Sequence, residues 1–200
     1  MTESLQLYFE AFKDFAKNRG ERRITYMEVM GISWALHIVY AFYSIFALYL
    51  GVKSYDYFSS SKDFSHLVLE SFSFKLQKAS MLSILFGVIF YPFIFQFAYK
   101  FWQALFKFYI NLFECNDEVI EEKADEILSS AFSGNLFLMF PIIGNVLSNI
   151  AFYFFLYQGL KRKYNFTSLQ ASLVLITPLF LMFLIAVFSA SYFLFLFTLF

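Results

Sequence analysis

The sequence predicts an all-α polytopic membrane protein with five transmembrane helices, with four as the other count considered. Composition is the first observation: hydrophobic residues make up 60% of the chain and charged residues 15%, against roughly 45–50% and about 25% in soluble domains. The second is that apolar runs long enough to cross a ~30 Å hydrocarbon core recur along the chain. The third is that one cysteine, seven glycines and three prolines exclude a disulfide scaffold and a collagen-like repeat.

Residues 1–24 form a separate N-terminal segment, expected to be cytoplasmic. Apolar residues recur at helical spacing from Leu5 to Ala16, and charged residues take the other face. This pattern predicts an amphipathic helix that lies in the membrane interface or packs on the rest of the protein. A basic cluster follows it: Lys17, Arg19, Arg22 and Arg23.

The transmembrane domain is predicted to cover residues 25–200. Thr25 and Glu28 have the spacing of a capping box, so the first spanning helix is expected to begin there. The predicted spans are residues 28–50, 79–105, 124–140, 146–160 and 169–199. Pro92 and Pro178 lie inside two of the apolar runs and are expected to kink them.

The count of five depends on a structural turn that divides the apolar stretch 132–160 into two spans. Its residues are Pro141, Gly144 and Asn145, and Asn145 and Asn149 are expected to fasten it to neighbouring helices. Positive residues in short loops mark the cytoplasmic side. Both basic clusters, the N-terminal one and residues 161–163, can be cytoplasmic only if an even number of spans separates them. Dividing the stretch 132–160 gives four spans between them, and the last apolar run brings the total to five. The polar loop expected at 51–78 is then outside.

Two features inside the predicted spans are candidates for a polar cavity or a lipid-headgroup site. His37 lies in the middle of the first span, where an ionisable residue is a functional candidate by default; the alternative is a neutral histidine hydrogen-bonded between helices. A polar stripe follows one face of the second long helix: Gln96, Lys100, Gln103, Lys107 and Asn111. It predicts a wet cavity wall or a headgroup site, or else lysines that snorkel beside interhelical amide bonds.

Seven of the fifteen acidic residues fall within residues 114–126, at the spacing of one helix face. They are Glu114, Asp117, Glu118, Glu121, Glu122, Asp125 and Glu126. This acidic cytoplasmic helix is a candidate docking face for a basic partner or divalent cations, or a solvated face. Because the cytoplasmic leaflet is itself negative, we expect one of the two basic clusters of the chain to cover the face at least partly.

No pattern of enzymatic chemistry stands out, so we expect no enzyme activity, cofactor or metal site. His37, His66 and Cys115 lie in different segments. The sequence has no Gly-rich phosphate loop, nucleophile elbow or His-Glu-x-x-His pattern. A net charge of 0 gives no reason to expect a nucleic-acid partner.

Four short stretches of the C-terminal half occur in a characteristic order: a Pro-aliphatic-aliphatic-Gly turn, a span ending in Gly-Leu, a polar loop and a Pro within the next span. They are Phe140-Pro141-Ile142-Ile143-Gly144-Asn145-Val146-Leu147, Gln158-Gly159-Leu160-Lys161, Ser168-Leu169-Gln170-Ala171 and Ile176-Thr177-Pro178. In this order the chain resembles the Yip family of Ypt-interacting membrane proteins, over roughly residues 80–190. The resemblance implies five spans, a cytoplasmic N-terminus and no known catalysis.

The resemblance is to the short, prokaryotic-type form of that family. No acidic-Tyr-Gly-Pro stretch of the eukaryotic kind precedes Glu28, so a Rab GTPase partner is not expected. The expected function is that of a non-enzymatic scaffold or adaptor in a prokaryotic plasma (inner) membrane, in contact with lipids, a protein partner and further copies of itself. The alternative is a small transporter, channel or lipid-handling protein with a polar cavity lined by His37 and the stripe; a hydrated cavity that reaches mid-membrane would favour it.

Overall fold

The structure, a computed structural model, is all-helical in the part of the chain that it describes. That part comprises residues 25–59, 74–113 and 120–199, with Gln6, Phe9, Glu10 and Lys13. The elements are α2 (Tyr26–Ser59), α3 (Phe74–Leu112), α4 (Ile120–Phe132), the 3₁₀-helix η1 (Ser133–Met139), α5 (Gly144–Lys163) and α6 (Ser168–Leu199). The amphipathic helix predicted within residues 1–24 lies outside the described residues except for those four.

Three of the described helices are long and apolar enough to cross a membrane. They are Tyr26–Gly51, Ala79–Leu112 and Ser168–Phe195, which correspond to the first, second and last predicted spans. The other two predicted spans fall on α4 with η1 and on α5, which do not meet the same criterion of length and apolarity. α4 carries carboxylates in its first turns, and α5 contains amides and ends in three basic residues.

Both helices of the first hairpin run further than their predicted spans. α2 continues to Ser59 and α3 begins at Phe74, so the connection expected at 51–78 lies within 60–73, outside the described residues. An apolar run marks only the part of a helix that matches the hydrocarbon. A helix can continue beyond that part where no proline interrupts it, and residues 51–59 and 74–78 contain none.

α2 and α6 begin with the same capping arrangement. The amide of Thr25 donates to the Glu28 carboxylate over 3.0 Å, and the amide of Glu28 donates to the Thr25 hydroxyl oxygen over 3.4 Å. Thr167 and Gln170 make the equivalent pair of bonds over 2.8 and 3.3 Å. The predicted capping box is therefore confirmed, and a second one sets the start of α6.

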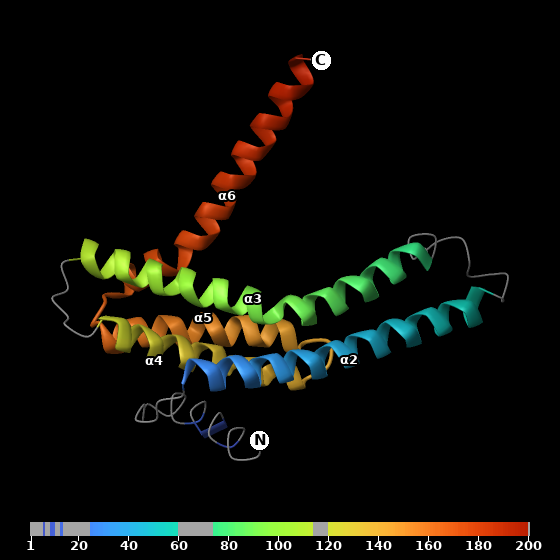
Figure 1. Cartoon of the computed structure of the whole chain (residues 1–200), viewed down its shortest axis with the longest axis horizontal. Coiled ribbons are helices and arrows are strands. Elements are labelled where there is room, and N and C mark those ends of the chain that lie inside the picture. The colour runs from blue at the N-terminus through green and yellow to red at the C-terminus, as the bar shows by residue number, and fades with distance from the viewer. Residues whose placement is uncertain are drawn as a thin grey trace.

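The molecule has three parts, which Figure 1 shows. The body comprises α4, η1, α5 and the portions of α2 and α3 that pack on them, residues 26–41 and 91–112. The arm is the rest of the α2–α3 hairpin, residues 42–59 and 74–90, and none of its described side chains is buried. α6 starts beside the body and then points away from it (Figure 1).

Aromatic side chains form much of the core of the body. α3 contributes a row spaced by three or four residues: Tyr91, Phe95, Tyr99, Trp102 and Phe106. The Phe95 ring lies 4.4 Å from that of Phe132 of α4, and the Phe132 ring lies 4.8 Å from that of Phe152 of α5. Contacts between aromatic side chains therefore join α3, α4 and α5.

α5 approaches its neighbours closely because glycines lie at the contacts. A Cβ on Gly144 would lie 2.6 Å from the carbonyl oxygen of Phe137, and one on Gly159 would lie 2.7 Å from Cγ2 of Ile127. Small residues allow such backbone approach between helices in membranes. Both glycines belong to the stretches that carry the family resemblance. Their role in this chain is close packing within the short hairpin that α4 and η1 form with α5.

The span predicted at 124–140 is not a single α-helix, which corrects the expectation. α4 ends at Phe132 and the chain tightens into η1. There the fully buried Ser133 donates its hydroxyl to the carbonyl of Ser130 over 2.5 Å, and a Cβ on Gly134 would lie 3.0 Å from Cβ of Ala151. The local side-chain bond and the close approach of α5 favour the narrower helix.

The break predicted after residue 140 is confirmed. Ile143 donates its amide to the Pro141 carbonyl over 2.8 Å, and Gly144 donates to the Phe140 carbonyl over 3.0 Å. Ile142 takes a φ of 69°, which is strained for a β-branched residue, and its side chain is 81% exposed. The tip of the short hairpin is therefore apolar and exposed.

α3 remains helical through Pro92 and bends midway along its length (Figure 1). A proline has no N–H to donate to the carbonyl four residues before it, which here belongs to Val88. The indole nitrogen of Trp34 on α2 donates to that carbonyl over 2.9 Å. Because a freed carbonyl inside hydrocarbon is costly, Trp34 both satisfies the break and joins α2 to α3.

Candidate functional site

A polar groove lies between α3 and α4 at the end of the body. It consists of two adjoining cavities of about 350 and 260 Å³ that share Lys100, Gln103 and Asp125. Four residues of the predicted stripe line it: Gln96, Lys100, Gln103 and Lys107. Glu121 and Asp125 of α4 and Tyr26 of α2 complete its walls. The structure therefore brings the polar stripe of one helix against the carboxylates of another.

Asp125 is held in a defined orientation in this groove. The Tyr99 hydroxyl donates to Oδ1 of Asp125 over 3.1 Å, and the side-chain amide of Gln103 donates to the same oxygen. Tyr99 is 2% exposed and its ring lies edge-on to that of Tyr26, with 4.8 Å between centroids. Because the buried phenol is fixed by packing, the carboxylate is oriented before any ligand arrives.

The two lysines of the groove are accessible. Nζ of Lys107 lies 3.8 Å from Oε1 of Glu121, and these side chains are 63% and 85% exposed. A pair this exposed contributes about 0–1 kcal/mol, so a ligand can replace it at little cost. Lys100 is exposed and has no ion-pair partner within the described ranges. With Glu121 and Asp125, the described residues of the groove carry two positive and two negative side chains.

The described acidic residues of the predicted docking face, Glu121, Glu122, Asp125 and Glu126, do not share one open face. Glu121 and Asp125 face α3, whereas Oε1 of Glu126 lies 2.6 Å from Nζ of Lys163 on α5, and the Glu126 side chain is 16% exposed. α4 packs between α3 and α5, so its carboxylates are divided between two neighbours. Glu122 is exposed, and Glu114, Asp117 and Glu118 lie outside the described residues.

The expected cover by the basic cluster 161–163 is confirmed at Lys163. The way in which α5 ends places Lys163 beside Glu126. Asn165 takes a left-handed φ of 55°, which ends α5, and the amide of Phe166 donates back to the Leu160 carbonyl over 3.4 Å. The Tyr164 hydroxyl donates to the Ile120 carbonyl over 2.7 Å, which fastens the end of α5 to the start of α4.

His37 lines neither cavity of the groove. Its ring lies 4.2 Å from that of Tyr91, and its Nδ1 is buried without a partner in the described part of the chain. The Tyr91 hydroxyl accepts from the Asn135 amide over 3.2 Å, and the Asn135 carbonyl oxygen accepts from the Ser148 hydroxyl over 2.7 Å. The two hydrogen bonds join α3, η1 and α5 in a partly buried polar network, and the ring contact of His37 adds α2.

Sequence reasoning missed this network, although a signal for it existed. Asn135 lies within the span predicted at 124–140, and an amide between helices that is partly removed from solvent requires hydrogen-bond partners. Asn145 and Asn149 were instead expected to fasten the turn to neighbouring helices. Both are exposed, and the Asn149 amide donates to the Asn145 carbonyl of its own helix over 2.9 Å. Ser148, between them in sequence, makes the contact across helices.

Within the described ranges, no group of three or more histidine, cysteine or acidic residues is placed to hold a metal ion. No model of a known protein family matches the chain, and no curated protein or solved structure does either. The resemblance to the Yip family stays a prediction.

Proposed function

We propose that the protein is a non-enzymatic membrane scaffold or adaptor of the Yip type that its C-terminal stretches resemble. One observation carries the proposal: α6 beyond Pro178 is apolar and separate from the body. Among the described side chains from residue 179 onward, all except Leu184 are exposed. A helix that the described part of its own chain leaves uncovered is available to helices of another protein.

The sequence of α6 supports association rather than simple anchoring. Ala186 and Ala190 are four residues apart, are both exposed and lie on one face. Such small-xxx-small spacing lets two helix backbones approach in lipid, where apolar surface by itself gives no drive to associate. Phe188 lies on the opposite face and offers no such approach.

Photo-crosslinking in native membranes tests this proposal. A photoreactive residue is placed at position 186 or 190, with position 188 as the matched control on the other face of α6. We expect a discrete protein adduct from 186 and 190 and only lipid adducts from 188. Lipid adducts at all three positions would reject the scaffold. An adduct of doubled chain mass would identify the partner as a second copy.

We further propose five membrane segments with a cytoplasmic N-terminus, in a prokaryotic plasma membrane. α5 is about 30 Å long at ~1.5 Å per residue, and α4 with η1 spans about 34 Å, so each can cross a ~30 Å core. The basic residues that end α5 lie in the same half of the molecule as the start of α2 (Figure 1). That arrangement supports a shared cytoplasmic side.

Cysteine labelling tests this topology in intact cells. Cys115 is the chain's one cysteine, so Cys115→Ser gives a background free of thiols. We expect an impermeant reagent to label Ile142→Cys from outside and Arg162→Cys only after permeabilisation. A shielded residue 142 would show that the short hairpin enters and leaves on one side. Labelling of residue 162 from outside would reverse the orientation.

Lipid handling is a second candidate function, and the groove favours it over transport or conduction. A transporter or channel of the kind considered requires one cavity that joins His37 to the stripe, whereas the groove is lined by the stripe and α4. Lipid handling is tested by the rate at which the reconstituted protein moves a fluorescent phospholipid between or across bilayers. A rate equal to that of protein-free vesicles would reject this candidate.

A further inference from the structure

We propose that the groove between α3 and α4 binds the headgroup of a zwitterionic phospholipid of the phosphoethanolamine class. Lys100 and Lys107 would hold the phosphate and Asp125 the ammonium group. This inference rests on the lipid-handling candidate and names its ligand. It is carried by the depth of the groove, the apolar surface beside it, the balance of its charges and the fixed position of Asp125.

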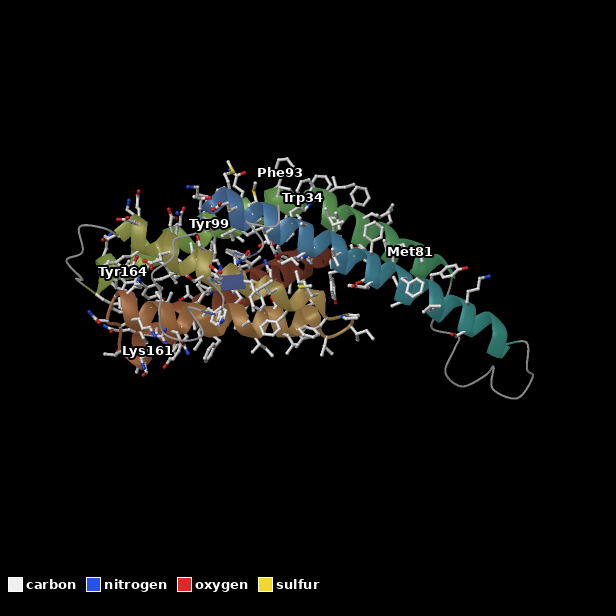
Figure 2. The ribbon with its side chains drawn as sticks, turned by 90° about the horizontal axis from the view of Figure 1, so that it is seen from below. Trp34, Met81, Phe93, Tyr99, Lys161 and Tyr164 are labelled. Carbon is white, nitrogen blue, oxygen red and sulfur yellow. The ribbon has the colours of Figure 1, made fainter. Side chains whose placement is uncertain are left out.

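The groove lies at the depth of phospholipid headgroups. Counting from Ala79, where the apolar run of α3 begins, about 20 residues at ~1.5 Å each cross a ~30 Å hydrocarbon core. Lys100 comes directly after that distance. Figure 2 shows nitrogen and oxygen atoms concentrated towards the end of the molecule with Lys161 and Tyr164, and carbon around Phe93 and Trp34. A lysine at this boundary reaches the phosphate level with its ammonium group.

An exposed apolar track leads from the groove towards the hydrocarbon. Phe93 and Phe97 are 69% and 75% exposed, and with Lys100 they follow one face of α3 at spacings of four and three residues. Phe93 projects outward in Figure 2. An acyl chain along these rings continues from a headgroup at Lys100. A soluble phosphoamine makes no use of them, which favours a lipid.

The charges of the groove select a zwitterion. Two lysines face Glu121 and Asp125, so the charges of the described lining residues balance. An anionic headgroup would be attracted to the lysines but repelled by the two carboxylates, because it has no positive group to pair with them. A phosphate with an attached primary amine complements both signs.

Asp125 suits a primary amine in particular. Oδ1 already accepts from Tyr99 and Gln103, which fixes the carboxylate, and Oδ2 accepts no hydrogen bond from the described residues. An ammonium group with N–H donors can bond Oδ2, whereas a trimethylated amine has no N–H to donate. We therefore expect phosphatidylethanolamine to bind more tightly than phosphatidylcholine.

The experiment is native mass spectrometry of the full chain in detergent, titrated with three lipids of identical acyl chains. These are phosphatidylethanolamine, phosphatidylcholine and phosphatidylglycerol, and soluble phosphoethanolamine is a fourth probe. The variants are Lys100→Gln and Asp125→Asn. The asparagine keeps a side-chain oxygen that can accept from the Tyr99 hydroxyl. Phe97→Ala tests the apolar track. Lys161→Gln is the matched control, a lysine of the same half of the molecule that bonds Ser168 instead. Thermal unfolding of each variant reports whether it has folded.

We expect phosphatidylethanolamine to bind most tightly. Lys100→Gln and Asp125→Asn should each weaken it about tenfold, the loss of one charge-assisted hydrogen bond, and Lys161→Gln should leave it unchanged. Asp125→Asn should not weaken the binding of phosphatidylglycerol, whereas Phe97→Ala should weaken the binding of all three lipids. Equal binding of phosphatidylglycerol, or an equal loss with Lys161→Gln, would overturn the proposal. Phosphoethanolamine binding as tightly as the lipid would assign the site to a soluble ligand instead.

The lipid-transfer assay separates this site from the function on which it rests. Specific binding without transfer would reject lipid handling and leave the site standing. Transfer that persists at the wild-type rate in Lys100→Gln and Asp125→Asn would reject the site and leave lipid handling standing.

Discussion

The body and α6 are both apolar, but only the body is packed. In the body, glycines and serines lie at the helix contacts, and the half-buried amide of Asn135 joins η1 to α3 and α5. α6 beyond Pro178 is apolar almost throughout, yet nearly all of its described side chains are exposed. Lipid solvates apolar side chains as well as another helix does, so hydrophobicity does not decide which helices associate. Close backbone approach and interhelical hydrogen bonds decide it.

The largest expected effect comes from filling a close contact of the body. Gly144→Ala would place a Cβ 2.6 Å from the Phe137 carbonyl oxygen, and backbone on both sides limits relaxation. We expect a loss of about 1–3 kcal/mol, the usual cost of overpacking, measured by thermal unfolding in mild detergent. Gly87→Ala on the arm is the control, because a Cβ there meets nothing within 4 Å. Equal losses from the two would show that the body is not held by close approach.

Removing the half-buried amide of Asn135 should have the next largest effect. Asn135→Ala loses the bonds to Tyr91 and Ser148. Interhelical hydrogen bonds in membranes average about 0.6 kcal/mol each, so we expect a loss of about 1 kcal/mol in the same unfolding measurement. Ser191→Ala in α6 is its counterpart, since among the described residues that hydroxyl bonds the Val187 carbonyl of its own helix. A comparable loss in α6 would contradict the distinction between the two regions.

The contact of Trp34 with the break at Pro92 predicts a smaller and conditional effect. Trp34→Phe removes the donor to the Val88 carbonyl and should cost about 0.6 kcal/mol. Pro92→Ala restores an N–H to that carbonyl within α3. In the Pro92→Ala background, Trp34→Phe should therefore cost less. A double-mutant cycle measures this coupling, and additive losses would show that Trp34 acts only through its size.

The smallest expected effect is in α6 itself. Phe188→Ala should change the free energy of unfolding of the body by less than about 0.5 kcal/mol, as for substitutions away from structural contacts. The Phe188 side chain is 71% exposed, whereas Phe106 of α3 is completely buried. Phe106→Ala should cost several times more in the same detergent. A large loss from Phe188→Ala would place α6 against the body and remove the observation that carries the proposed scaffold.

The sequence by itself determined what depends on neighbours along one helix. Thr25 and Glu28 identify where α2 begins, because a capping box needs only two side chains one turn apart. Pro141 identifies the turn, and the spacing from Gln96 to Lys107 places four polar residues on one face of α3. The fold class follows from composition. Each of these signals acts over a few residues, so no tertiary contact is needed to interpret it.

The tertiary structure decided which faces meet. Glu121 and Asp125 belong to the groove while Glu126 pairs with Lys163, because α4 packs between two helices. Spacing alone assigned these carboxylates to one face. Asn135 bonds Tyr91 across 44 residues of chain, and Trp34 bonds the Val88 carbonyl across 54. Helical periodicity fixes the direction of a side chain on its own helix, but the helix it meets depends on the packing of the whole bundle.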